Sequence, residues 1–266
     1  NLNSAACLLV DGQLVAWVEE ERLNRLKHSQ GNPANLSIQW CLKTGGVTLE
    51  DVDAIAVGLD HNVSPLSPER FLQSKNFYMQ RALMDQLLFR RDDPRIRFVN
   101  HHLAHALSAY DLSGFDEAIT ITLDGTGGGE AGILAVGRGD DFEVLHRIHN
   151  DSSWGHFYTL VTEKLGFAPH SAEGKTMGLA AYGTPDPAFF DACIDWDAEI
   201  PKLDRERRKS LFAKIPFRGP GVPLGKMHKD LAASAQFAFE SAAFGRGSVD
   251  GLFSPSGARG AREGPP

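Results

Sequence analysis

The chain has few cysteines, no long apolar run and no excess of basic residues, and each of these features excludes a class of protein. Its 266 residues contain three cysteines, Cys7, Cys41 and Cys193, which are odd in number and widely spaced. We therefore expect no disulfide framework and a reducing compartment, which predicts a cytoplasmic protein. No apolar run reaches the ~20 residues that a membrane helix needs. The first ten residues lack the basic start and cleavage site of a secretory signal.

The charge balance argues against a nucleic acid or an anionic membrane as a partner. Acidic residues outnumber basic ones by 34 to 27, which gives a net charge of −7. The composition, 42% hydrophobic and 23% charged, is that of an ordinary globular protein, and the length suits one large domain or two small ones.

The order of apolar runs predicts an α/β fold with a mixed sheet. We expect strands at residues 4–10, 14–19, 54–59, 96–99, 118–123, 132–136 and 142–148, and helices at 34–44, 68–90, 101–110, 157–165, 177–182, 203–214 and 228–244. Residues 245–266 contain six glycines and three prolines without apolar periodicity, which predicts a disordered tail after a domain at 1–244.

The stretch NHHLAHA predicts a metal site. His101 and His105 are four residues apart, so a helix would place both imidazoles on one face, where they can chelate a divalent transition metal. Asp124, at the end of the apolar run 119–123, is a candidate third ligand. The alternative is that the histidines only cap or fill a helix.

A glycine-rich segment follows this aspartate. Gly125, Thr126, Gly127 and Gly128 could form a phosphate nest, because glycines let backbone N–H groups approach an anion closely. The segment does not precede a helix, so it is neither a P-loop nor a Rossmann turn. The alternative is a flexible glycine hairpin. Lys175 is a second possible phosphate contact, with a surface lysine in a turn as its alternative.

Residues 19–28 form a charged run with two interpretations. Composition alone favours a solvated connector. The other interpretation is that Arg22, Arg25 and Lys27 are cations that await an anion.

Four segments in order carry a resemblance to a known family: SAACLLVDGQLVAWVEEERLNRLKH, NHHLAHALSAY, LDGTGGGE and EGKTMGLAAYG. From about residue 3 to about residue 240 the chain resembles the N-terminal part of the O-carbamoyltransferases of the nodulation and antibiotic-tailoring type. The resemblance implies an actin-like ATPase (ribonuclease H-like) fold. It also implies that ATP and carbamoyl phosphate give a carbamoyl-adenylate, whose carbamoyl group passes to a hydroxyl of a small-molecule acceptor.

The resemblance also implies roles for individual residues. His101, His105 and Asp124 correspond to metal ligands, and the donor set suits iron or zinc equally. Lys27 corresponds to an active-site lysine near the carbamoyl group, which reverses the interpretation from composition. The glycine segment 125–128 and Lys175 correspond to nucleotide-phosphate contacts.

Two departures from the family pattern favour an incomplete enzyme. The family carries a histidine where this chain has Leu2, and leucine cannot act as a general base. The second actin-like subdomain and the domain that makes the carbamoyl-adenylate have no counterpart here. We therefore expect a truncated enzyme that could use a separate C-terminal half, or a non-catalytic metal- or nucleotide-binding remnant. A sugar or acetate kinase relative is disfavoured, because Mg²⁺ in such kinases prefers oxygen ligands to histidine.

Overall fold

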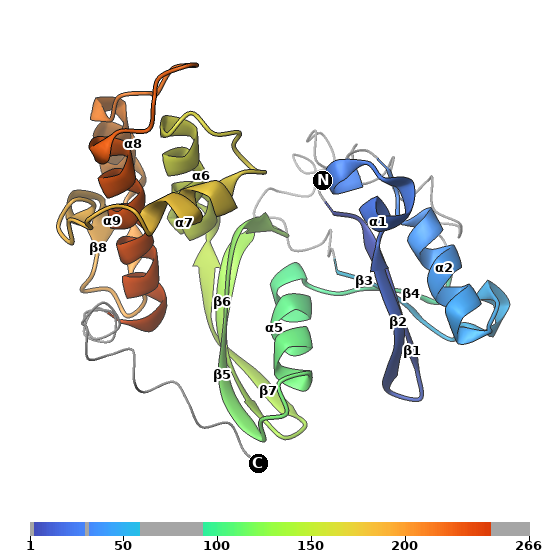
Figure 1. The fold of residues 1–266 in the computed structure, drawn as a ribbon. Coiled ribbons are helices and arrows are strands. Elements are labelled where there is room, and N and C mark those ends of the chain that lie inside the picture. The colour runs from blue at the N-terminus through green and yellow to red at the C-terminus, as the bar shows by residue number, and fades with distance from the viewer. Residues whose placement is uncertain (1–2, 30–31, 59–92, 246–266) are drawn as a thin grey trace, which may run out of the picture. The chain divides into compact units, whose positions relative to one another are not determined.

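The computed structural model describes residues 3–29, 32–58 and 93–245, and these fall into two units (Figure 1). The division lies between His101 and His102, within the first turn of a helix. The expected helix at 68–90, Leu2, and the expected tail beyond Gly245 lie outside the described residues.

A hairpin covered by a helix forms the centre of the first unit. Strands β1 (Ala5–Val10) and β2 (Gln13–Glu19) pair antiparallel across a two-residue turn in which both residues, Asp11 and Gly12, have positive φ. Helix α2 (Asn35–Gly45) packs on this hairpin and ends at Gly46, whose φ of 68° is the left-handed conformation that glycine adopts readily. Strands β3 (Ile55–Val57) and β4 (Ile96–Phe98) pair parallel.

The charged run between β2 and α2 is not a wholly solvated connector. It forms the short helix α1 (Glu20–Asn24) and a 3-10 turn, η1 (Lys27–Ser29). The Glu20 side chain is buried and accepts hydrogen bonds from the backbone N–H groups of Leu36 and Ser37 and from the Ser37 hydroxyl. Glu20 therefore supplies the N-terminal cap that the residues next to α2 do not provide.

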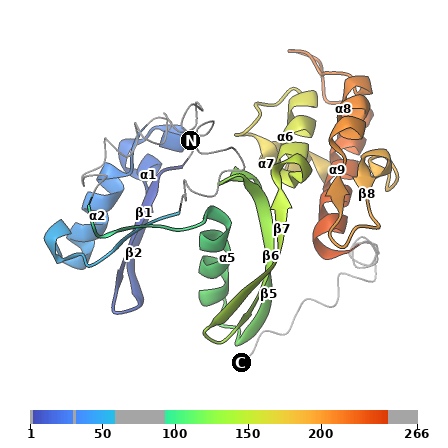
Figure 2. The same cartoon turned by 180° about the vertical axis from the view of Figure 1, so that it is seen from behind.

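A three-stranded antiparallel sheet with a helix on one face organises the second unit (Figures 1 and 2). Strands β5 (Glu117–Gly127), β6 (Glu130–Arg138) and β7 (Asp141–His149) lie in that order. Helix α5 (His101–Asp111) packs on the sheet through Ala106, which contacts Ile133 and Ala135 in a small buried cluster.

A helical layer at one end of this sheet contains the largest core (Figure 2). It consists of α6 (Trp154–Lys164), α7 (Glu173–Ala180), α8 (Arg205–Lys214) and α9 (Lys226–Phe244), with the short strands β8 (Ile194–Asp195) and β9 (Lys202–Leu203). The second unit also has 3-10 turns at Asn150–Ser152 and Asp191–Cys193, and the first unit has one at Leu49–Asp51. Trp154, Phe157 and Phe190 are almost completely buried there, with rings packed edge to face. Because β5 also contacts α6, this core fixes the end of the sheet.

The structure confirms the α/β class but not a single mixed sheet. The described residues form four small sheets, one parallel and three antiparallel. The three cysteines are free thiols, as expected. Among the helices of the described residues, none combines the length and the apolar character needed to cross a bilayer.

Candidate metal centre

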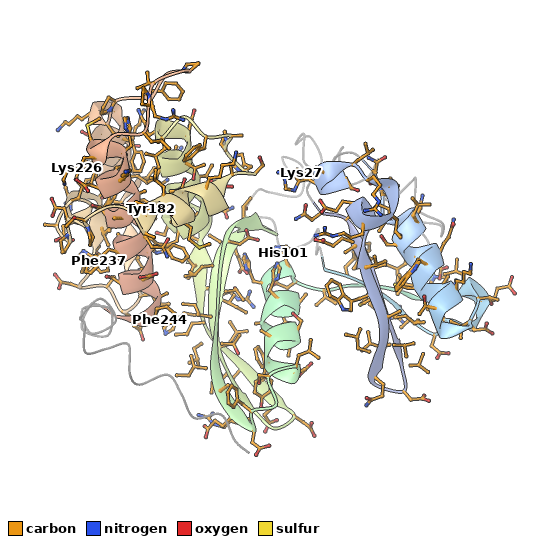
Figure 3. The ribbon with its side chains drawn as sticks, in the orientation of Figure 1. Lys27, His101, Tyr182, Lys226, Phe237 and Phe244 are labelled. Atoms are coloured by element: carbon orange, nitrogen blue, oxygen red, sulfur yellow. The ribbon has the colours of Figure 1, made fainter. Side chains whose placement is uncertain are left out.

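Helix α5 places the two predicted histidine ligands on one face of its first turns. His101 begins the helix (Figure 3) and is half-buried, whereas His105, one turn later, is exposed. The His101 Nδ1 atom lies 3.1 Å from the carbonyl oxygen of Gly58. Since a carbonyl can only accept, Nδ1 carries the proton, and Nε2 is the ring nitrogen that could bind a metal. Metal-binding histidines commonly donate their second N–H in this way.

Strand β5 presents the third predicted ligand at an interruption of its ladder. Leu123 pairs with Gly132, but the next pair joins Gly127 to Glu130, so Asp124 and its two successors bulge out of the sheet. The Gly125 N–H donates to Asp124 Oδ1 over 2.6 Å, which fixes the orientation of the carboxylate. A bulge of this kind turns a side chain out of the strand alternation.

These three side chains converge on one point. The candidate ligand atoms of His101, His105 and Asp124 all lie within 4.8 Å of one another. Two bonds of ~2.1 Å to a tetrahedral metal separate their ligand atoms by about 3.4 Å, so small side-chain rotations bring the three onto one ion. Two imidazoles and one carboxylate are a donor set that suits iron or zinc. The residues present therefore fit the metal that the sequence predicts.

Residues at the start of α6 hold the backbone of Asp124. The buried Ser153 hydroxyl lies 3.0 Å from the Asp124 carbonyl oxygen and 2.7 Å from that of Gly125, and it accepts the His156 N–H as the cap of α6. Gly155 packs so closely on this backbone that a Cβ atom there would lie 2.4 Å from the Asp124 carbonyl carbon. Ser153 and Gly155 are not among the predicted site residues, although a serine before an apolar helix is a recognisable cap signal.

His156 is a further titratable group beside the bulge. A Cβ atom at Gly125 would lie 3.6 Å from the His156 ring, and the ring contacts that of His170 with 6.5 Å between centroids. Burial lowers the pKa of His156, and the positive charges of His170 and Arg208 lower it further, against the opposing effect of the Asp124 carboxylate. A neutral imidazole therefore faces the bulge near pH 7.

The glycine segment is the end of a hairpin. β5 continues to Gly127, Gly128 and Gly129 form a two-residue turn with φ of 60° and 91°, and β6 follows at once. The Thr126 hydroxyl donates to the Asn150 side-chain oxygen over 2.9 Å. The hairpin interpretation is therefore confirmed, while phosphate contacts by residues 125–128 remain a prediction.

Lys175 lies in the first turn of α7 and is exposed, so it is helical and not in a turn. The helix begins four residues earlier than expected, at Glu173, whose carboxylate accepts both the His170 N–H and the Thr159 hydroxyl. The Lys175 ammonium lies 6.0 Å from the centre of the Phe167 ring. A phosphate contact by Lys175 remains a prediction.

Lys27, in the first unit, lies in a strained part of the backbone. It is exposed and is labelled in Figure 3. Arg25, His28 and Ser29 around it have φ of 63°, 62° and 43°, the left-handed region that non-glycine residues rarely adopt. Strain of this kind persists only where the surroundings impose it, and it is concentrated at functional sites.

Hydrogen bonds from both sides impose this conformation. Asn24 donates from its side-chain amide to the Ser29 hydroxyl and accepts the Leu26 N–H, each over 2.8 Å. The His28 N–H donates to the Glu21 carboxylate over 2.7 Å. These bonds hold the loop that presents Lys27, and the role of this lysine near the carbamoyl group remains a prediction.

Comparisons with known proteins agree with the resemblance. A family model described as "Carbamoyltransferase N-terminus" matches residues 66–210. The chain is similar to the nodulation protein NolNO of Sinorhizobium fredii, with 39% identity over 258 residues that cover 91% of this chain and 37% of the relative. It is 36% identical over 151 residues to the nodulation protein NolO of Bradyrhizobium diazoefficiens, covering 55% of this chain and 27% of the relative. An uncharacterised Synechocystis protein is 30% identical over 279 residues, covering 90% of this chain and 45% of that protein. The chain thus spans less than half the length of these relatives.

Proposed function

Because the chain belongs to the carbamoyltransferase N-terminus family, we propose that it forms part of an O-carbamoyltransferase of actin-like fold. The reaction moves a carbamoyl group from carbamoyl-adenylate, made from ATP and carbamoyl phosphate, to a hydroxyl of a small-molecule acceptor. The acceptor oxygen bonds to the carbamoyl carbon, the bond from that carbon to the adenylate phosphate breaks, and the hydroxyl proton passes to a base. The three free thiols are compatible with a cytoplasmic location for this reaction.

The convergence of His101, His105 and Asp124 supports this proposal most directly. These residues would hold an iron or zinc ion, which when bound would supply positive charge against the phosphate and the developing negative charge of the transfer. The hydrogen bond from His101 to Gly58 favours the tautomer in which Nε2 would bind the metal. The Gly125 N–H keeps the Asp124 carboxylate oriented before a metal arrives.

Lys27 would supply the second positive charge. An exposed ammonium on a strained and multiply hydrogen-bonded loop is held in place for an anion or a polarised carbonyl at low entropic cost. Backbone N–H groups at Gly125–Gly128, the Thr126 hydroxyl and Lys175 would contact the nucleotide phosphates.

A second candidate function is a metal- or nucleotide-binding module that does not turn over by itself. The observation in its favour is that the converging ligand atoms of His101, His105 and Asp124 can bind a metal without any transfer taking place. On this view the transfer needs a separate C-terminal half. The two candidates differ in whether carbamoylated product forms without such a half.

A transfer assay tests the enzymatic proposal. The chain is incubated with ATP, radiolabelled carbamoyl phosphate and candidate hydroxyl acceptors, with and without the remaining part of the nodulation relative. We expect label in the acceptor, and its absence in both arms would count against the enzymatic proposal. Lys27→Ala should lower the rate by a factor on the order of 100. Lys43→Ala, at an equally exposed lysine of the same unit, is the matched control and should not.

Elemental analysis tests the metal centre separately. The purified chain should contain about one equivalent of iron or zinc, and His101→Ala combined with His105→Ala should remove it. His149→Ala, at an exposed histidine of β7, is the control and should leave the metal content unchanged. Equal metal content in the double variant and the unaltered chain would refute the ligand assignment.

A further inference from the structure

We propose that His102, between the two histidine ligands in sequence, is the positioning residue of the metal centre. This inference rests on the proposed metal site and assigns His102 no contact with the metal. Its imidazole fixes α5 against β5 and β6, so that His101 and His105 face Asp124 at the separation that one ion needs.

His102 is completely buried, and its ring joins three elements. Nδ1 lies 3.1 Å from the Thr122 hydroxyl of β5, and Nε2 lies 3.1 Å from the Glu130 carbonyl oxygen at the start of β6. Because α5 carries the ring, a single side chain links the helix to both strands. Both ring nitrogens are engaged with the sheet, while the ligand atoms of His101 and His105 converge with that of Asp124.

The hydrogen bonds form one directed chain. The Glu130 carbonyl can only accept, so Nε2 donates, and in the tautomer with its proton on Nε2 the ring accepts at Nδ1. The Thr122 hydroxyl then donates to Nδ1 while it accepts the Ile133 N–H over 2.9 Å. A buried network in which each of these groups has a partner specifies one arrangement of its elements more strictly than apolar contact does.

The two residues that His102 contacts lie before and after Asp124 in the sequence. Thr122 is two residues before Asp124 on the same strand, and Glu130 is the first residue of β6 after the glycine turn. His102 therefore holds both ends of the bulged hairpin tip that presents Asp124. A slip of α5 along the sheet would break both bonds before it separated the ligands.

The competing explanation is a core histidine that only contributes to stability. A metal-binding test separates the two, because a purely structural histidine would change the unfolding temperature without changing the affinity of the folded chain for a metal. Outer-shell hydrogen-bond partners typically change metal affinity by ~10–100-fold when they are substituted.

The experiment uses the full 266-residue chain, stripped of metal, with Co²⁺ as the probe. Affinity is measured by competition with a chelator and geometry from the visible absorption of bound cobalt, with circular dichroism to confirm folding. His102→Leu should weaken cobalt binding by ~10–100-fold and change the spectrum. His102→Gln should recover part of the affinity, since its amide N–H can still donate to the Glu130 carbonyl.

Substitutions at Thr122 keep the test decisive if His102→Leu does not fold. Thr122→Val removes the hydroxyl and should weaken binding, whereas Thr122→Ser keeps it and should not. Thr162→Val is the control, because the Thr162 hydroxyl likewise links two elements, pairing with that of Thr176 over 2.9 Å between α6 and α7. It should lower stability and leave cobalt affinity unchanged.

Three outcomes decide between the proposals. Weaker binding and an altered spectrum in the folded His102 and Thr122→Val variants support the positioning role. Unchanged affinity and spectrum in these variants, with normal binding by the unaltered chain, overturn this inference but leave the metal centre standing. No binding by the unaltered chain overturns both.

Discussion

Gly155→Ala should destabilise the protein, although alanine is normally the better helix former. Gly155 is the second residue of α6 and packs on the backbone of the metal-ligand bulge. A Cβ atom there would lie 2.4 Å from the Asp124 carbonyl carbon and from the Gly125 nitrogen. Both atoms belong to the backbone and cannot rotate away, so either the helix or the bulge must move.

Two opposing effects set the size of the change in the free energy of unfolding. Atoms in good contact are ~3.5–4.0 Å apart, so the elements must separate by about 1 Å. Overpacking of this kind costs ~1–3 kcal/mol. Replacing glycine by alanine inside a helix returns ~0.5–1 kcal/mol. We therefore expect a net loss of roughly 0–2.5 kcal/mol in the free energy of unfolding, about 1 kcal/mol at the midpoints of the two ranges.

Gly178→Ala provides a control of opposite sign. Gly178 lies inside α7, and a Cβ atom there would have no neighbour within 4 Å. The free energy of unfolding of this variant should rise by ~0.5–1 kcal/mol. Its melting temperature should therefore rise, whereas that of Gly155→Ala should fall. At this chain length each kcal/mol shifts the melting temperature by ~2–4 °C. Thermal unfolding followed by circular dichroism measures both. If Gly155→Ala melted as high as Gly178→Ala, the close approach of α6 to the Asp124 backbone would be wrong.

Three further predictions concern capping, thiol reactivity and acid stability. Glu20→Ala should cost ~1–3 kcal/mol, because it leaves N–H groups at the start of α2 without their buried acceptor, and chemical denaturation should show this loss. A thiol reagent at pH 8 should label about one cysteine in the folded chain, and Cys7→Ser should remove that label, because Cys7 is exposed whereas Cys41 and Cys193 are buried. Burial raises the pKa of Cys7 and raises that of Cys193 to about 11, so even Cys7 should react more slowly than an ordinary thiol. Two labelled thiols in folded Cys7→Ser would contradict this. The hydrogen bonds from Arg95 lower the pKa of Asp93 to about 2, so this carboxylate stabilises the fold above its unfolded pKa of ~3.9 and the contribution is lost as pH falls towards 2. The difference in melting temperature between the unaltered chain and Asp93→Asn should therefore close between pH 4 and pH 2, and a constant difference would contradict the assignment.

Local sequence patterns predict most of the described elements, because each element depends on its own periodicity. The hairpin around Asp11–Gly12, α2 with its terminal glycine, and the three strands of the second unit are confirmed within a few residues. The errors occur at element boundaries, where a cap or a backbone pair extends an element beyond its apolar pattern. α9 begins two residues early because the His228 ring accepts the Gly225 N–H, and β5 continues because Gly127 pairs with Glu130 across the glycine turn.

The candidate site likewise contains residues that the sequence could predict and residues that it could not. His101 and His105 could be paired from the sequence because the helix repeat alone brings them together. Asp124 could be proposed because it ends an apolar strand close by. In contrast, Ser153 and Gly155 approach Asp124 only through tertiary packing across about thirty residues, and no periodicity marks them. Such residues carry ordinary cap and helix signals, so their role becomes visible only when the backbone they hold is known.

The ligands are therefore only part of the metal centre. His102 fixes one side of the bulged hairpin tip and Ser153 fixes the other, so Asp124 is held between α5 and α6 by bonds that involve no metal. If both are needed, combining His102→Gln with Ser153→Ala should weaken cobalt binding by more than the product of the two single effects, because each remaining anchor limits the movement that loss of the other allows. Strictly multiplicative effects would show instead that the two sides act independently and that the bulge is rigid without either.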